Sequence, residues 1–240
     1  MKTDEINYLL KTAFAKRISL FGDPETDCFR IFNSSGDGLE GLTADWYSGY
    51  ILVQYFKAGV ESGIEIIMDQ VKACSMILPA PVNGVLVKNR MAMPESEGTE
   101  KWKSRLIHGS YPDEGIVVRQ NGIMMNADLV NGQNTGIFLD MREIRDELAG
   151  FYKREKPVSM LNLFCYTGAF SVHALKGGVQ RAVNVDLSRS VLRRARDNYR
   201  LNGLGADERD FIYGDSYDRV KIFAKKNIHF DFAVFAHPTF

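Results

Sequence analysis

The chain has 240 residues, of which 45% are hydrophobic, so it is long enough to bury the core of one large domain or of two small ones. Thirty basic and thirty acidic residues give a formal net charge of zero at pH 7, and this balance provides no overall attraction to nucleic acid or to an anionic membrane. No run of 18 apolar residues is present, and the N-terminal stretch is too charged for a secretory signal.

The cysteines and histidines argue against a disulfide framework and against a metal site. The three cysteines form no CxxC pair, and the four histidines are scattered without the spacing of metal ligands. An odd, small number of cysteines fits a reducing compartment. We therefore expect a cytoplasmic protein that holds no metal.

The first part of the chain predicts a small α+β domain over residues 1–150. Apolar residues at helical spacing indicate helices at 3–20 and 61–78, and MREIRDELAGFYKRE indicates another at 141–155, which Pro157 ends. A mobile loop is expected at 91–105, because that stretch is polar and has no period. Strands are expected in the ranges 29–32, 44–56 (two strands around Ser48-Gly49), 84–89 and 115–129 (a hairpin that turns at Asn121-Gly122).

Residues 151–240 predict a second domain of the α/β class. From Val158 onward strand and helix alternate without a break, which is typical of a parallel sheet with helices on both faces. The expected strands cover 159–164, 181–187, 208–215 and 230–235, and the expected helices cover 167–178, 188–203 and 216–227.

A short motif between the first two of these strands indicates a nucleoside site. The strand turns at Thr167-Gly168 into a helix, and glycine there lets a ligand approach the main chain. Eighteen residues later Asp186 ends the next strand, where a carboxylate can accept hydrogen bonds from both ribose hydroxyls. Asp215 ends the third strand, where it could read an adenine amino group. The alternative is a plain strand-to-helix turn with two surface aspartates. The loop lacks the three glycines of G-x-G-x-x-G, which argues for a cofactor without a pyrophosphate.

Several stretches resemble a known family. LNLFCYTGAFSVHAL, VDLS, DNYRLNGL and GDSY are similar to the cofactor-binding motifs of class I S-adenosylmethionine-dependent methyltransferases. GQNTGIFLDMREIR and FRIFNSSGDGLEGLTADWYSGYILVQ resemble segments of one branch, the large-subunit 23S ribosomal RNA methyltransferases, which include cytosine-C5 enzymes.

The resemblance implies a Rossmann-like domain that binds S-adenosyl-L-methionine and an RNA substrate, in an enzyme of rRNA processing. The cofactor would lie on the loop of Phe164, Cys165, Tyr166, Thr167 and Gly168, with Asp186 and Leu187 at the ribose and Asp215 and Ser216 at the adenine. The stretch GQNTGIFLDMREIR, called the upstream signature below, adds three residues. Gln133, Phe138 and Arg142 of this stretch would close over the cofactor or support its loop.

The chain departs from the family pattern at three places. Only about fifteen residues precede the matched region, where the family carries an RNA-binding domain of PUA type, and Asn134 replaces the family's lysine. At the end, Ala236-His237-Pro238-Thr239-Phe240 stands where the family has Asp-Pro-Pro followed by Lys, Thr or Ser and then Phe. The family continues with three more strands and, in its cytosine-C5 members, a catalytic cysteine. We therefore expect a cofactor domain that is truncated at its C-terminus, and no catalytic residue can be assigned. On this interpretation a full-length parent is active, while this chain itself binds the cofactor weakly and transfers no methyl group.

The same resemblance predicts the strand order 3-2-1-4, which leaves the fourth strand as an open apolar edge. A missing C-terminal region or a second copy in a homodimer would cover that edge.

Several other residues suggest catalysis or RNA binding but fit a structural role better. Cys165 has no basic partner in the sequence and fits a small buried hydrophobe better than a nucleophile. His237 could be a general base, although a residue so near the chain end is more easily loose. The arginine-rich stretch RSVLRRAR fits the solvated face of an amphipathic helix better than a nucleic-acid stripe, and Trp46, Tyr47 and Tyr50 fit a core or domain interface.

The function predicted from the sequence is therefore an S-adenosylmethionine-dependent methyltransferase acting on RNA, most simply 23S rRNA. Two alternatives stay open. One is a non-catalytic cofactor- or RNA-binding protein descended from such an enzyme, and the weaker one is a small-molecule methyltransferase.

Overall fold

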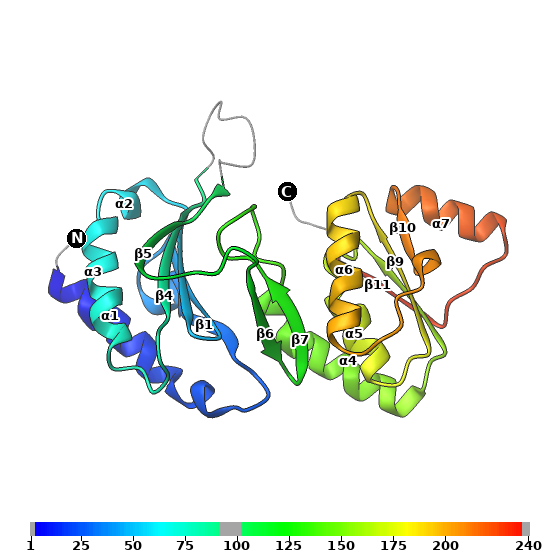
Figure 1. The fold of residues 1–240 in the computed structure, drawn as a ribbon, viewed down its shortest axis with the longest axis horizontal. Coiled ribbons are helices and arrows are strands. Elements are labelled where there is room, and N and C mark those ends of the chain that lie inside the picture. The colour runs from blue at the N-terminus through cyan, green and yellow to red at the C-terminus, as the bar shows by residue number, and fades with distance from the viewer. Residues whose placement is uncertain (1–2, 92–101, 237–240) are drawn as a thin grey trace. The chain divides into compact units, whose positions relative to one another are not determined.

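The computed structural model describes residues 3–91 and 102–236, and these form two compact units. One unit consists of Met1–Gly122 and Ala127–Thr135, and the other of Ile123–Asn126 and Gly136–Phe240. A domain boundary near residue 150 is predicted from the sequence, whereas the compact units change over between residues 122 and 136. Each unit is described on its own below (Figure 1).

The first unit is built on a five-stranded sheet with the order β1-β2-β3-β4-β5. Its strands pair antiparallel except for β3 and β4, which are parallel and are joined through the short helix α2 (Ala58–Glu61) and α3 (Ile64–Ser75). The strands are β1 (Cys28–Asn33), β2 (Leu42–Tyr47), β3 (Tyr50–Tyr55), β4 (Gly84–Asn89) and β5 (Arg105–Gly109).

Strand β5 is the element of this sheet that the sequence does not reveal. Its five side chains are exposed or only half-buried, so the buried alternation that marks a strand is absent. It forms because the edge of β4 is free to pair with it, with Val87 opposite Arg105 and Gly84 opposite Gly109. Residues 92–101 of the expected mobile loop lie outside the described residues.

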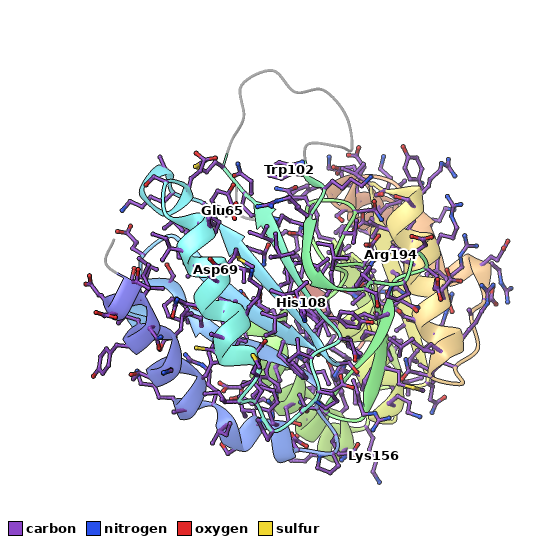
Figure 2. All side chains as sticks on the ribbon, turned by 60° about the vertical axis from the view of Figure 1, so that its left-hand side comes forward. Glu65, Asp69, Trp102, His108, Lys156 and Arg194 are labelled. Carbon is purple, nitrogen blue, oxygen red and sulfur yellow. The ribbon has the colours of Figure 1, made fainter. Side chains whose placement is uncertain are left out.

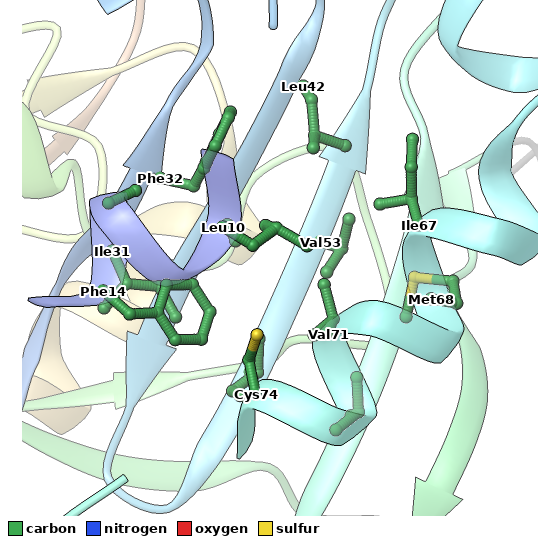
Figure 3. Packing of buried hydrophobic residues seen from close by; sticks show 14 of the residues in the cluster. Leu10, Phe14, Ile31, Phe32, Leu42, Val53, Ile67, Met68, Val71 and Cys74 are labelled. Carbon is green, nitrogen blue, oxygen red and sulfur yellow. The ribbon is translucent and has the colours of Figure 1, made fainter. Parts of the chain in front are cut away.

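Helices α1 (Thr3–Lys16) and α3 cover one face of this sheet and form its core (Figure 1). Figure 3 shows Leu10 and Phe14 of α1 and Val71 and Cys74 of α3 converging on strand residues such as Val53. Trp46 of β2 is buried in the same core, as expected. Helix α1 ends at Lys16, where a 3₁₀ turn (Ile18–Gly22) follows, so the expected helix to residue 20 is four residues too long.

Two further strands, β6 (Ile116–Gln120) and β7 (Ile123–Ala127), form a hairpin, as the sequence predicts. The turn residues Asn121 and Gly122 have φ of 51° and 75°. This left-handed pair is the conformation that favours Asn-Gly in two-residue hairpin turns.

The second unit contains a four-stranded parallel sheet with the order β10-β9-β8-β11. This confirms the order 3-2-1-4 and the Rossmann-like α/β class. Buried residues of α4 and α5 pack on Met160 and Ala182, while Phe223 of α7 packs on the cluster of Leu161 and Val183, so the helices cover both faces. The strands are β8 (Ser159–Leu163), β9 (Arg181–Asp186), β10 (Phe211–Tyr213) and β11 (Phe232–Phe235), and the helices are α4 (Arg142–Glu155), α5 (Ala169–Lys176), α6 (Arg189–Leu201) and α7 (Ser216–Lys225).

Within the described ranges, none of the helices has both the length and the apolar character needed to cross a membrane.

Candidate cofactor site

The site begins with a strained loop at the carboxyl end of β8, residues 164–168, called the 164–168 loop below. Phe164, Tyr166 and Gly168 have φ of 55°, 49° and 78°, so three alternate residues are left-handed and two of them are not glycine. Hydrogen bonds hold this shape: Cys165 N donates to Val185 O at 3.0 Å and Gly168 N donates to Cys165 O at 2.9 Å. Strained conformations of this kind persist only where the surroundings fix them, and they cluster at ligand sites.

Asp186 lies beside this loop at the end of β9. Its Oδ2 accepts from Tyr166 N at 3.0 Å and its Oδ1 accepts from Ser188 N at 2.9 Å, so the carboxylate ties the loop to the neighbouring strand. Burial raises the pKa of Asp186, and main-chain hydrogen bonds from Ser188, Tyr166 and Leu187 act in the opposite direction. A carboxylate has about four acceptor positions, so it can bind ribose hydroxyls as well as these amides. The following side chain, Leu187, is 59% exposed and offers an apolar surface at the same strand end.

Asp215 and Ser216 come together with the loop at the start of α7. Asp215 is the N-cap of this helix, and its Oδ1 accepts from Tyr217 N at 2.9 Å and Asp218 N at 3.1 Å. The buried Ser216 Oγ accepts from Phe164 N at 3.3 Å. The 164–168 loop, Asp186 and Asp215 thus lie at the carboxyl ends of β8, β9 and β10, along one edge of the sheet. The expected contact of Asp215 with adenine stays a prediction.

The upstream signature residues divide between the two compact units. Phe138 belongs to the second unit, where its ring centroid lies 5.0 Å from that of Tyr166. Arg142 begins α4 in the same unit. Gln133 belongs to the first unit, where its carbonyl accepts a hydrogen bond from Arg90. The roles of Gln133 and Arg142 toward a cofactor stay predictions.

Contacts from outside the 164–168 loop, which the sequence does not predict, hold it in place. Thr167, which is fully buried, donates from Oγ1 to Gly136 O at 2.5 Å. The Tyr166 hydroxyl hydrogen-bonds to Arg194 of α6 and to the main chain of Gly136; burial raises the pKa of Tyr166 and Arg194 opposes that rise. Figure 2 labels Arg194 on this helix.

A signal for a supporting residue on α6 is nevertheless present in the sequence. Asn198 lies among the apolar positions Leu192, Ala195 and Tyr199 of an amphipathic helix, and the structure buries all four. A buried amide needs partners, so its position on the apolar face indicates a specific hydrogen-bonding task.

Cys165 is buried, with 4% of its surface exposed, and burial together with nearby Asp186 raises the pKa of its thiol. A raised thiol pKa disfavours the nucleophilic thiolate, in agreement with the predicted structural role. His237 and the residues after it lie outside the described residues, whereas Ala236 is described and donates from its N to Leu163 O at 3.4 Å.

These residues suit a nucleoside that carries no pyrophosphate. The carboxylate of Asp186 can accept from two hydroxyls, Leu187 offers an apolar surface, and Gly168 has no side chain to obstruct or cap the start of α5. Aromatic rings border the same edge, with Phe164 at 5.2 Å from Phe235 and 5.9 Å from Tyr217 between centroids. The donor and acceptor set therefore fits S-adenosylmethionine.

Two curated relatives are ribosomal RNA methyltransferases. Ribosomal RNA large subunit methyltransferase I of Aeromonas salmonicida is 34% identical over 212 residues, which are 88% of this chain and 51% of that protein. The protein of the same name from Photobacterium profundum is 31% identical over 96% of this chain and 56% of its own length. The chain thus spans about half the length of the curated relatives it matches.

Two solved methyltransferase structures are similar to this chain. A candidate SAM-dependent methyltransferase from Streptococcus mutans has a TM-score of 0.85 at 25% identity, over 98% of this chain and 58% of that one. A candidate methyltransferase solved in complex with S-adenosylhomocysteine has a TM-score of 0.87 at 26% identity, over 100% of this chain and 59% of that one. A family model described as S-adenosylmethionine-dependent methyltransferase matches residues 29–240. The chain belongs to the family of S-adenosylmethionine-dependent methyltransferases.

Proposed function

We propose that this protein is an S-adenosylmethionine-dependent methyltransferase that acts on RNA, with 23S ribosomal RNA as the substrate. The observation that carries the proposal is the 164–168 loop bound to Asp186 at the carboxyl edge of a parallel sheet, in a chain of this family. The RNA substrate rests on the names of the relatives, which are ribosomal RNA methyltransferases. A cytoplasmic location goes with such a substrate.

S-adenosylmethionine supplies an electrophilic methyl group when it is bound. In this proposal the chain's own contribution is binding and orientation: Asp186 accepts from the ribose, Leu187 and Phe138 contact apolar surface, and the 164–168 loop fixes the direction of approach. Holding two reactants in line is by itself worth a large part of a methyl-transfer barrier. None of the described residues is assigned as a catalytic base or nucleophile.

The cofactor site is tested by calorimetric titration of S-adenosylhomocysteine into the 240-residue chain and into Asp186→Asn. Replacing the carboxylate by an amide removes its charge and turns one of its two acceptor oxygens into a donor, so the ribose hydroxyls and the main-chain amides of Tyr166 and Ser188 compete for a single uncharged acceptor. We therefore expect the affinity to fall about tenfold or more. Asp231→Asn is the matched control. Asp231 also accepts from two main-chain amides, Val158 N and Ser159 N at 2.7 Å each, but at the opposite end of β8.

Equal losses of affinity in Asp186→Asn and Asp231→Asn would show that the first effect is general destabilisation, and the assigned ribose contact would be wrong. Transfer itself is tested with cofactor labelled in its methyl group and ribosomal RNA from cells lacking the modification. The proposed activity predicts label in 23S rRNA and none in transfer RNA, and incorporation that prefers transfer RNA would contradict the proposed substrate.

A second candidate function is a non-catalytic cofactor- or RNA-binding protein. It is favoured by Ala236, which follows β11 at the position where the resembled family carries an acid. Binding of S-adenosylhomocysteine without methyl transfer to any RNA would favour this second function over the first.

We also propose that a further segment of polypeptide, or a second copy of the chain, covers the outer edge of β11. Support comes from the apolar character of this edge strand, in which Ala233 and Phe235 are exposed. An uncovered apolar edge strand readily pairs with another chain.

A further inference from the structure

The outer edge of β7 is bound by side chains of α6 and of its C-cap residue Asn202. Asn202 Oδ1 accepts from Met124 N at 3.0 Å, and Asn202 Nδ2 donates to Met124 O at 2.7 Å. Two residues further along the strand, Asn198 Oδ1 accepts from Asn126 N at 2.9 Å. The helix therefore supplies the hydrogen bonds that a neighbouring strand would otherwise make.

The spacing of the two elements explains why this works. Residues 198 and 202 are one helical turn apart, a rise of about 6 Å, and residues 124 and 126 of a strand are about 6.6 Å apart on one edge. Arg194, one turn earlier, continues the row by donating from Nη2 to Asn126 O at 3.4 Å. A side chain at Gly136 would collide with this arginine, since its Cβ would overlap Arg194 Nη2.

Asn198 differs from Asn202 in also contacting the 164–168 loop. Its Nδ2 donates to Thr167 O at 2.9 Å, while its Oδ1 accepts from both the N and the Nδ2 of Asn126 at 2.9 Å each. A main-chain N–H can only donate and a carbonyl can only accept, so these partners fix the orientation of the amide. Asn198 is fully buried, and no water molecule can replace its partners without rearrangement.

We propose that Asn198 is a positioning residue of the cofactor site, which sets the 164–168 loop through Thr167 and does so only when β7 is in place. The 164–168 loop is strained at Phe164 and Tyr166, so it requires fixed neighbours to hold its shape. Asp186 holds it from the sheet side at Tyr166 N, and Asn198 holds it from the helix side one residue later. Strand β7 thereby becomes part of the cofactor site although it makes none of the assigned cofactor contacts. This inference rests on the proposed cofactor site.

The test compares Asn198→Asp with Asn202→Asp. In Asn198→Asp one oxygen still accepts from Asn126, but the other faces the Thr167 carbonyl and repels it. Asn202→Asp removes the amide group that donates to Met124 O and Asn198 O, at 2.7 Å each, and leaves Thr167 untouched. Both variants place one carboxylate in the same row, one turn apart at the end of α6, which makes them a matched pair.

We expect Asn198→Asp to bind S-adenosylhomocysteine about tenfold more weakly than the wild type, and Asn202→Asp to bind it with an affinity within about twofold. Thermal unfolding of both variants measures the loss of stability, which we expect to be similar in the two. A merely structural role for Asn198 predicts equal changes of affinity, so equal affinities in the two variants would overturn the proposal.

Asn126→Ala tests the same positioning role of Asn198 if Asn198→Asp does not fold. This change removes only the side-chain amide donor to Asn198 Oδ1, so the orientation of the Asn198 amide loosens while the main-chain contact stays. We expect S-adenosylhomocysteine affinity to fall about threefold, and an unchanged affinity would contradict the inference. A wild-type chain that binds no S-adenosylhomocysteine would overturn the proposed cofactor site and this inference together, whereas wild-type binding with unaffected variants would overturn the inference alone.

Discussion

At the scale of single residues, the chemistry of the cofactor site depends on main-chain conformation. Gly168 is the N-cap of α5 and has φ of 78°, which an L-residue adopts only with strain. A Cβ at this position would lie 3.1 Å from Ala195 Cβ, so the glycine also permits the close packing of α6 against the loop.

Gly168→Ala is expected to lower the free energy of unfolding by about 1–2 kcal/mol from the left-handed conformation alone, and by more from the contact with Ala195. It should also weaken binding of S-adenosylhomocysteine, because the 164–168 loop must shift. Gly203→Ala is the matched control, since Gly203 has φ of 69° and nothing lies within 4 Å of its Cβ position. Urea unfolding and calorimetry on both variants separate the two effects, and equal losses of stability and affinity would refute a role for the Ala195 contact.

At the scale of elements, strand β4 fixes the segment that carries Gln133. Lys88 is fully buried, and its Nζ donates to Gly132 O at 3.0 Å. Arg90, two residues later in the chain, hydrogen-bonds to Gln133 O and donates to Asn134 Oδ1 at 3.4 Å. Burial, and secondly the charge of Arg90, lower the pKa of Lys88 to about 8, although Asp128 acts in the opposite direction.

The lowered pKa of Lys88 should make the stability of the fold depend on pH. Below pH 8 both the folded and the unfolded chain hold the proton, so the penalty of the buried charge is fully present. Between pH 8 and the ordinary value of 10.5 the folded chain releases the proton first, so stability rises with pH. Relative to Lys88→Met, the wild type should gain up to about 3 kcal/mol over this interval.

Urea unfolding between pH 7 and 10.5 measures that difference, with Lys103→Met, at an exposed position, as the control. A difference between the wild type and Lys88→Met that does not change with pH would contradict the buried charge.

At the scale of the whole molecule, β11 forms one edge of the parallel sheet. Phe235 at its end is 52% exposed, and its ring lies 5.9 Å from that of Tyr217 of α7, which is also 52% exposed. Apolar side chains gathered at a sheet edge favour association, because pairing would bury them and satisfy the edge amides at the same time.

We therefore expect the 240-residue chain to associate at micromolar concentration. Ala233→Lys, at an exposed position of β11, should reduce this association because a charge on an edge strand opposes pairing. Gln180→Lys adds the same charge at an exposed position between α5 and β9 and serves as the control. Light scattering after size-exclusion chromatography measures the mass of each, and a wild type that stays monomeric at all concentrations would rule out this role of the edge.

Much of the fold follows from the sequence. The alternation of strand and helix was predictable from local periodicity, and the Asn-Gly hairpin from turn chemistry. The order of the four parallel strands followed from the resemblance to the methyltransferase family. Strand β5 was not predictable, since its side chains are exposed and its existence depends on the free edge of β4.

What the sequence by itself determined is the type of site: a glycine turn and an acid at consecutive strand ends specify a nucleoside cofactor, because parallel strands bring their carboxyl ends to one edge. Only the tertiary structure decided how that site is held. Asn198, Asn126 and Thr167 are far apart in sequence, and a hydrogen-bonded row between a helix and a strand edge arises only once packing brings them together.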